Sequence, residues 1–296
     1  MIEVIITYII TASRNLLSKY LIDPSTIKVR TSLKLPKIKR EDYADWNTYY
    51  WTYQYILAET YYIPRLQTWG IEIENEKVLD IGCGDGGFTS AFANAGGVCT
   101  GVEIRKFDWK KSENVNYIVQ DIMHINAIQN VANNYDLIIL RDVMEHIPII
   151  EKKKFLQSVM KFGKLGASFL ITFPPFYSPF GLHQQTLLKS SAKYFPYLSL
   201  LSNKILLPML KIFKEDKKAI KNIVALRESK MTIRAFNRLI LEIGLTIQEE
   251  EYFFVRPSHE IRYGWKMRKF TNKPLIGIRE LATLGVSYLL SNSVKN

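Results

Sequence analysis

The residues with the clearest chemical potential form a glycine-rich turn at 78–87, with the sequence VLDIGCGDGG. Gly82, Gly84 and Gly87 have the spacing G-x-G-x-x-G, in which the glycines permit a tight turn and let the backbone approach a cofactor closely. Glu103 follows Gly82 by 21 positions, which suits a carboxylate that holds ribose hydroxyl groups. These residues indicate a cofactor that contains adenosine, and a dinucleotide is one candidate.

Two carboxylates at this turn distinguish between cofactors. Asp80 precedes the first glycine and Asp85 lies within the turn. A pyrophosphate bound there would meet like charges, which cost several kcal/mol at about 4 Å and an effective dielectric constant of roughly 20. S-adenosylmethionine has no phosphate and presents an ammonium and a sulfonium group. The acidic turn therefore predicts S-adenosylmethionine rather than NAD.

Short apolar segments alternate with helical periods from Lys77 onward and would position this turn. We expect strands at Lys77–Ile81, Val98–Glu103, Asn116–Val119, Asp136–Leu140, Ser168–Phe173 and Leu245–Val255. We expect helices at Phe88–Ala95, Ile125–Ala132, Ile150–Phe162, Thr232–Ile243 and, as an amphipathic last element, Ile278–Leu290. Strands without alternation that are separated by helices predict an α/β fold with a parallel sheet covered on both faces.

The pattern divides the chain into four expected parts. Residues 1–60 form an N-terminal helical cover, 61–175 the α/β core that binds the cofactor, 176–230 a lid or substrate insertion, and 231–296 the helix–strand units that complete the sheet. The aromatic stretch from Asp42 to Trp69 reads as one or two helices interrupted at Pro64.

Composition and charge narrow the class of protein. The 296 residues are 47% hydrophobic, which excludes a disordered tail, and two cysteines exclude a disulfide scaffold and indicate the cytoplasm. The net charge of +12 is concentrated in residues 1–40 and 181–296, around an acidic middle. Basic flanks can attract nucleic acid, anionic lipid or phosphorylated substrates, or can be a solvated surface.

The stretch from Tyr194 to Lys221 is apolar and basic but contains Pro196 and Pro208. A membrane-spanning helix with these residues is not expected. A lid that excludes water is one interpretation. The other is a peripheral contact with the inner face of a membrane, where a lipid-linked acceptor would be presented.

Four ordered motifs resemble those of class I S-adenosylmethionine-dependent methyltransferases, over roughly residues 60–175 and the last helix–strand units. They are the turn at 78–87, Glu103, the step Val119-Gln120-Asp121, and the segment 135–147 with the sequence YDLIILRDVMEHI. The resemblance implies a Rossmann-like seven-stranded sheet in the order 3-2-1-4-5-7-6, with S-adenosyl-L-methionine as cofactor. It also implies a set of cofactor-binding residues: Asp80, Gly82, Gly84, Gly86, Glu103, Asp121, Ile122 and Arg141.

The segment after the fourth strand is similar to that of quinone-biosynthesis O-methyltransferases and their small-molecule relatives. In some of those enzymes the residues that match Asp142, Glu145 and His146 bind a divalent metal. Here we expect no metal, and a turn in which Glu145 and His146 orient one another or contact the cofactor. The Pro-Pro-Tyr/Phe motif of enzymes that methylate amino groups in nucleic acid or protein is missing from this position, which argues against nucleic acid as a partner.

A hydroxyl acceptor benefits from a base with a pKa near neutrality, and histidine is the first choice. His146 follows the fourth strand at the carboxyl edge of the sheet, and His183 follows the loop after Pro174-Pro175. Both are candidate catalytic bases, whereas His124 and His259 are expected to be structural or on the surface.

The sequence thus predicts an enzyme that methylates a hydroxyl of a small molecule, with a glycan or a lipid-linked metabolite as the specific hypothesis. Two alternatives stay open: an RNA or protein methyltransferase that uses the basic flanks, and a non-catalytic module that binds the cofactor or a membrane. The sequence makes no prediction of the oligomeric state.

Overall fold

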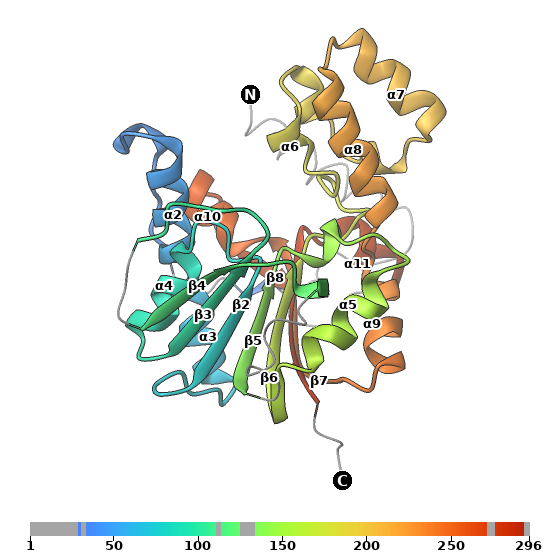
Figure 1. Ribbon diagram of the computed structural model, residues 1–296. Helices are drawn as coiled ribbons and strands as arrows, with labels where there is room; N and C mark the ends of the chain where they lie inside the picture. Colours follow the sequence, from blue (N-terminus) through green and yellow to red (C-terminus); the bar gives the residue numbers. More distant parts are fainter. Residues whose placement is uncertain (1–28, 31–33, 111–113, 125–133, 271–275, 293–296) are drawn as a thin grey trace.

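The computed structural model describes residues 29–30, 34–110, 114–124, 134–270 and 276–292, and one sheet runs through them. Its order over these ranges is β1-β8-β7-β9-β6-β5-β2-β3-β4 (Figure 1). The strands are β1 (Val29–Arg30), β2 (Lys77–Ile81), β3 (Val98–Glu103), β4 (Val115–Val119), β5 (Tyr135–Arg141), β6 (Gly163–Phe173), β7 (Thr246–Val255), β8 (Arg268–Phe270) and β9 (Gly285–Ser291). Strands β2 to β6 are parallel, and β9 is antiparallel to both of its neighbours.

This order contains the expected seven strands. The sequence 3-2-1-4-5-7-6 corresponds to β4-β3-β2-β5-β6-β9-β7, and β8 and β1 extend the sheet beyond β7 by antiparallel pairing. The six strands predicted from apolar runs coincide with β2 to β7, although β6 begins five residues earlier than expected.

The prediction of an amphipathic helix over Ile278–Leu290 is wrong. Helix α11 (Ile276–Ala282) ends early, and the rest of the segment is β9, in which every residue is buried. Strand β9 lies between β6 and β7 with both faces covered. A strand of this kind has no alternation of apolar and polar residues, so periodicity does not separate it from a short helix.

Helices cover both faces of the sheet. One face packs α2 (Trp46–Leu57), α3 (Ile63–Thr68), α4 (Gly87–Asn94) and α10 (Pro257–Tyr263), and the other packs α5 (Lys152–Met160) and α9 (Ile233–Glu242). Along β5, Leu137 and Ile139 belong to the apolar cluster beneath α2, α3 and α4. Ile138 and Leu140 belong to the cluster beneath α5 and α9, on the opposite face of the sheet. This alternation of buried side chains, period two along the strand, holds the three layers together.

The helical region before the sheet is continuous. A π-helical turn at Ala58–Tyr62 joins α2 to α3, and Pro64 is near the start of α3, where its missing N–H costs little. The predicted helices Phe88–Ala95, Ile150–Phe162 and Thr232–Ile243 correspond to α4, α5 and α9. The predicted helix Ile125–Ala132 lies outside the described residues.

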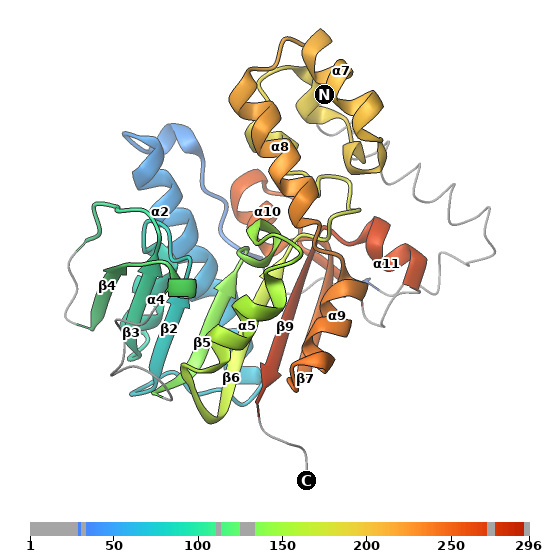
Figure 2. The same ribbon diagram turned by 45° about the vertical axis from the view of Figure 1, so that its right-hand side comes forward.

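Residues 176–230 have a small apolar core of their own. They contain α6 (Gln184–Leu187), α7 (Asn203–Ile212) and α8 (Lys217–Ser229), which share buried residues such as Leu182, Leu206 and Ile223. Both views place these helices above the upper edge of the sheet (Figures 1 and 2). In the described part of the chain, no helix is long and apolar enough to cross a membrane.

Candidate active site

The glycine turn between β2 and α4 requires glycine at several positions. Gly82, Gly84 and Gly86 have φ angles of 76°, 55° and 84°, which other residues rarely adopt. A Cβ on Gly86 would lie 2.3 Å from the Tyr117 hydroxyl. Nothing lies within 4 Å of a Cβ built on Gly84, so the surface of the turn is open there.

Glu103, at the end of β3, is tied to this turn. Its carboxylate accepts hydrogen bonds from the backbone N–H of Gly84 at 3.2 Å, of Ile104 at 3.0 Å and of Arg105 at 3.3 Å. A carboxylate has about four lone-pair sites, so capacity for a ligand hydroxyl remains. The carboxylate is therefore fixed beside an open stretch of backbone, as a ribose-binding residue must be.

The two aspartates of the turn are held differently. Asp80 is only 2% exposed and accepts a hydrogen bond from Thr89 Oγ1 at 2.6 Å, so it faces α4 rather than solvent. Asp85 accepts a long hydrogen bond from the N–H of Gly87 at 3.4 Å. Burial raises the pKa of both carboxyl groups to about 6. Both are largely ionised at neutral pH and favour a cationic ligand.

Two aromatic rings cover the turn, and the sequence patterns had not indicated them. Trp109 stacks on Tyr117 with ring centroids 4.9 Å apart, and its indole N–H donates to the Gly84 carbonyl at 2.8 Å. The Tyr117 hydroxyl donates to the Gly86 carbonyl at 3.1 Å. The pair thus fixes two carbonyls of the turn. Trp109 belongs to no motif, so no signal in the sequence identifies it.

The residues after β4 lie close to this turn. The N–H of Gln120 donates to the Glu103 carbonyl at 3.0 Å, which joins the ends of β3 and β4. Asp121 is exposed and accepts a hydrogen bond from the N–H of Met123 at 2.9 Å. Ile122 is 6% exposed and belongs to the apolar cluster beneath α5. Asp121 thus lies at the surface beside the turn, whereas the Ile122 side chain is used in packing.

A network of charges follows β5. Asp142 has the left-handed φ of 54°, which costs on the order of 1–3 kcal/mol. Its carboxylate accepts two hydrogen bonds from Arg256 at 2.6 and 2.7 Å, and Arg141 lies at 3.4 Å. Burial would raise the pKa of Asp142, but the two guanidinium groups hold it below its usual range. Asp142 is therefore ionised and fully engaged.

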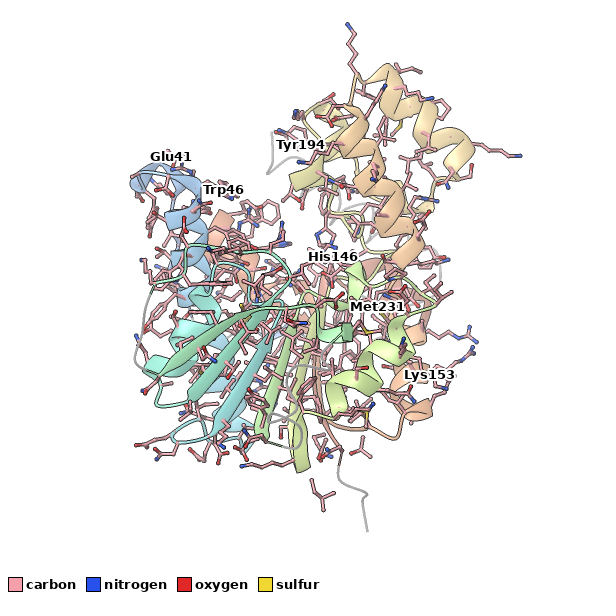
Figure 3. The ribbon with its side chains drawn as sticks, viewed as in Figure 1. Glu41, Trp46, His146, Lys153, Tyr194 and Met231 are labelled. Atoms are coloured by element: carbon pink, nitrogen blue, oxygen red, sulfur yellow. The ribbon has the colours of Figure 1, made fainter. Side chains whose placement is uncertain are left out.

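Glu145, His146 and His183 converge next to this network. Their ligand atoms all lie within 4.8 Å of one another, and His183 Nε2 is 3.7 Å from Glu145 Oε1. Glu145 is 4% exposed, yet both of its oxygens and His183 Nε2 have no hydrogen-bond partner among the described residues. Figure 3 shows His146 at the upper edge of the sheet, below α6 and α8. Buried polar atoms without partners are costly, so this cluster is arranged for a ligand.

The residues of the cluster come from two parts of the chain. Lys152, at the start of α5, donates to the carbonyls of Met144 and Ile147, so it holds the turn that carries Glu145 and His146. His183 has a left-handed φ of 51° and precedes α6. The 176–230 segment thus supplies one member and the β5–α5 turn supplies the other two.

Burial controls protonation in the cluster. It raises the pKa of Glu145 well above the usual range, with repulsion from Asp142 adding to the effect. It lowers the pKa of His183 to about 4, with nearby His146 and Arg256 adding to the effect. His146 is also shifted downward by burial. Both imidazoles are neutral at physiological pH and can accept a proton.

The ligand types in this cluster also suit a divalent metal. Asp142, the first residue of the matching motif in the relatives, does not fit because two arginines occupy its carboxylate. Glu145 and His146 do fit, and His183 takes the third position in the cluster. The cluster therefore differs from the metal set of the relatives' motif, because His183 of the 176–230 segment stands beside Glu145 and His146 where the motif would have Asp142.

The other two histidines of the chain are His124 and His259. The side chain of His124 is outside the described residues. His259, on α10, is close enough to Arg256 and Arg262 that burial and their charges lower its pKa to about 3. Arg256 was missed by sequence reasoning because it lies 114 positions from Asp142 and has no local signature.

Comparisons with known proteins identify the family of the chain. A family model described as methyltransferase domain matches residues 53–202, just over half of the chain. The ubiquinone biosynthesis O-methyltransferase of Coxiella burnetii is 33% identical over 86 residues, and that of Hydrogenovibrio crunogenus is 31% identical over 84. These matches cover 26% of this chain and 36% and 34% of the relatives, so the chain spans about a third of the relatives' length.

The chain is also similar to a solved structure from Burkholderia thailandensis. This is 1,6-didemethyltoxoflavin-N1-methyltransferase with bound 1,6-didemethyltoxoflavin and S-adenosylhomocysteine, which is 11% identical with a TM-score of 0.47. The similarity covers 83% of this chain and 81% of that one.

Proposed function

Because the chain belongs to the methyltransferase-domain family, as a class I S-adenosylmethionine-dependent methyltransferase, we propose that it methylates a hydroxyl group of a small molecule. The observation that supports this proposal is the 3.7 Å distance between His183 Nε2, on a half-buried ring, and Oε1 of the buried Glu145. A neutral imidazole oriented by a carboxyl group is the arrangement that general-base catalysis on a hydroxyl requires.

Bound S-adenosylmethionine supplies an activated methyl group on a sulfonium, so the protein's main task is alignment and proton removal. Gly82, Gly84 and Gly86 form the backbone surface for the cofactor, Glu103 holds its ribose, and Asp121 contacts its adenine amine. Arg141 lies near Asp80 and Asp85, so its position suits the methionine carboxylate.

His183 acts as the base in this proposal. Its Nε2 faces Glu145, which leaves Nδ1 for the acceptor. Nδ1 takes the hydroxyl proton while the acceptor oxygen bonds to the methyl carbon and the carbon–sulfur electron pair returns to sulfur. An oxygen of Glu145 then accepts a hydrogen bond from the Nε2–H of the imidazolium and so stabilises it. If a divalent metal is bound, Glu145, His146 and His183 hold it, and it supplies charge that makes the hydroxyl more acidic.

An acceptor panel with radiolabelled S-adenosylmethionine tests the reaction type. The panel contains small phenols and sugars, their O-methylated counterparts, matched amines, total RNA and a protein mixture. We expect label only in compounds with a free hydroxyl. Transfer to RNA, protein or the amines, or no transfer to any member, would contradict the proposal.

Two matched histidine variants test the base. We expect His183→Gln to lower turnover by about 100-fold or more and to leave the affinity for S-adenosylhomocysteine unchanged. His146→Gln should lower turnover less, because the 3.7 Å contact with Glu145 is made by His183. Turnover that is unchanged in His183→Gln removes this residue from the mechanism. Inhibition of the wild type by EDTA, reversed by Mn²⁺ or Zn²⁺, would assign the cluster to a metal instead.

We further propose that the methyl acceptor is a lipid-linked metabolite or a glycan. The exposed apolar side chains on and before α7 support the lipid: Leu200, Ile205 and Ile212 are 54%, 58% and 79% exposed. Lys204 and Lys211 flank the two isoleucines on the same helix. An apolar face with flanking lysines suits an anionic membrane surface.

Sedimentation with vesicles tests this part. We expect the protein to sediment with vesicles that contain phosphatidylglycerol and not with purely zwitterionic vesicles. The double variant Ile205→Asp/Ile212→Asp should lose the interaction, while Leu241→Asp, a change at a 76% exposed apolar residue on α9, should not. If the wild type does not sediment with either kind of vesicle, a soluble glycan is the better acceptor. If all three proteins sediment equally with the anionic vesicles, Ile205 and Ile212 do not form the membrane contact.

A further inference from the structure

Arg262 is a guanidinium group without a counter-ion in the described part of the chain. It is half-buried on α10, and its Nε is buried without a hydrogen-bond partner. Burial disfavours its charge, but neighbouring Tyr53 and Tyr263 and a side-chain hydrogen bond with Tyr49 outweigh burial and raise the pKa of Arg262. A buried charge is normally paired with an opposite charge, and a bound anion would supply the ionic partner that the described residues do not.

The surroundings of Arg262 are flat and aromatic. Its guanidinium carbon lies 5.3 Å from the Tyr53 ring centroid and 5.2 Å from that of Tyr263. Tyr263 also contacts Trp265, with centroids 5.0 Å apart. Rings beside a guanidinium stabilise it by cation–π contact without using its hydrogen-bond donors, and Arg262 uses one donor in a side-chain hydrogen bond with Tyr49. The site therefore combines a fork of donors with surfaces on which another ring can stack.

His259 adds a second unpartnered polar atom. It lies three residues before Arg262 on α10, and residues at this spacing share a helix face. Its Nδ1 is buried without a hydrogen-bond partner among the described residues. Its ring is 5.7 Å from both Tyr263 and Trp265. His259 and Arg262 thus belong to one cluster.

The charges around α10 do not balance. Arg141, Arg256 and Arg262 all have Tyr53 as an electrostatic neighbour, yet Asp142 is the ionised carboxylate that pairs with the first two. Burial raises the pKa of Glu145 well above its usual value, and the carboxylate of Glu260 on α10 accepts hydrogen bonds from the backbone N–H groups of Leu35 and Met267. A Cβ on Gly264 would lie 3.2 Å from Lys37 Nζ, so another cation lies beside the end of this helix. The excess positive charge favours an anion.

We propose that Arg262 and His259 form a subsite for an anionic group on the methyl acceptor, and that the acceptor joins this group to an aromatic ring. The subsite lies on α10, beside α2 and near Asp142, whose field reaches His259. Both views show α10 next to α2 at the upper part of the molecule (Figures 1 and 2). A carboxylate matches the guanidinium fork with two parallel hydrogen bonds, and a phosphate offers the same chemistry. The inference rests on the proposed function, because it describes the acceptor of that reaction.

Calorimetric titration of the protein saturated with S-adenosylhomocysteine tests the subsite without knowledge of the natural acceptor. The probes are 4-hydroxybenzoate, 4-hydroxybenzamide and phenyl phosphate. We expect the acid to bind about tenfold or more tightly than the isosteric amide, because a charge-assisted hydrogen bond is stronger than a neutral one. The ratio of acid to phosphate affinity then identifies which anion the subsite prefers.

Variants assign the effect to Arg262. Arg262→Gln should abolish the preference for the acid and keep the binding of the amide, whereas Arg238→Gln, at an exposed arginine on α9, should change neither. His259→Gln should reduce the preference in part. Thermal unfolding and S-adenosylhomocysteine affinity, both unchanged, show that each variant is folded.

Three outcomes would overturn the inference. They are equal affinity for acid and amide, no detectable binding of either at millimolar concentration, and an unchanged preference in Arg262→Gln. A loss of S-adenosylhomocysteine affinity in folded Arg262→Gln would assign the site to the carboxylate of the cofactor instead of the acceptor. If S-adenosylhomocysteine does not bind the wild type, the proposed function fails before the subsite is tested.

Discussion

The candidate site has two halves, the glycine turn and the cluster at the β5–α5 turn, and the buried polar groups of the two halves differ in their hydrogen bonding. In the described part of 77–121, which carries the glycine turn, no buried side-chain polar atom is without a partner. Glu103 and Trp109 are both bonded to the backbone of Gly84. In the half made by the β5–α5 turn, α6 and α10, Glu145, His183, His259 and Arg262 all have unpartnered buried atoms. The first half is complete in its own hydrogen bonds, whereas the second is incomplete, as our proposal of a bound acceptor requires.

The largest effect should come from the charge network that separates these halves. Asp142→Asn leaves Arg256 and Arg141 without an ionised partner, and we expect a loss of about 3 kcal/mol in the free energy of unfolding. Because the folded pKa of Asp142 lies below its usual value, its stabilisation is present above about pH 4 and is lost as the pH falls through the folded pKa. Denaturant titration at pH 7 measures the difference.

A second ion pair provides the control for this variant. Asp136 pairs with Lys164 at 2.5 Å, but the two side chains are 24% and 44% exposed. We expect Asp136→Asn to cost about 1 kcal/mol or less. Equal losses in the two variants would contradict the view that the buried network organises the site.

A smaller effect should come from the complete half. Gly86→Ala places a methyl group 2.3 Å from the Tyr117 hydroxyl in a left-handed backbone, so the turn must distort. We expect S-adenosylhomocysteine affinity to fall about 100-fold, a loss of roughly 2.7 kcal/mol in binding free energy. Calorimetry measures this loss directly.

Gly166→Ala is the matched control for Gly86→Ala. Gly166 has the same left-handed backbone, with φ of 83°, but nothing lies within 4 Å of its Cβ. This variant should lose about 1 kcal/mol of stability from backbone strain and bind S-adenosylhomocysteine as the wild type does. Normal binding by Gly86→Ala would show that the turn does not cradle the cofactor.

The pH dependence of cofactor binding sharpens the comparison further. Asp85 has a pKa of about 6, so it is ionised at pH 7.5 and mostly protonated at pH 5. We expect S-adenosylhomocysteine, which retains an ammonium group, to bind about three- to tenfold more weakly at pH 5. Asp85→Asn should bind weakly at both values. Tighter binding of S-adenosylhomocysteine at pH 5 than at pH 7.5 would contradict a favourable contact between ionised Asp85 and the ammonium group.

The smallest effect belongs to an exposed ion pair between α5 and α9. Lys153 lies 3.3 Å from Glu242, and the two side chains are 53% and 46% exposed (Figure 3). Lys153→Gln should change the free energy of unfolding by at most about 0.5 kcal/mol and should leave cofactor binding unchanged. A larger loss in denaturant titration would mean that exposed pairs matter more here than their geometry indicates.

The sequence predicts the complete half well and the other half in part. Local rules determine the first: the glycine spacing requires a tight turn, and buried parallel strands are apolar throughout, so β2 and β3 were predicted with correct bounds. Long-range pairing determines the second. Arg256 reaches Asp142 across 114 residues, and His183 meets Glu145 from a separate segment, so their spacing carries no motif.

The failure at Ile278–Leu290 has the same origin. Strand β9 is recognisable only from its neighbours β6 and β7, because it is buried on both faces. A sequence pattern records local geometry, whereas the position of this strand depends on contacts far along the chain.

The central claim is that the incomplete half is a base site for a hydroxyl acceptor, and one measurement tests it most directly. This is the single-turnover rate of methyl transfer to a hydroxyl acceptor from the panel, in wild type and His183→Gln, from pH 5 to 8. Because the pKa of His183 is about 4, the base is neutral throughout. The account predicts a rate in His183→Gln about 100-fold lower at every pH, with saturating cofactor in both proteins. Equal rates in the two proteins would contradict it.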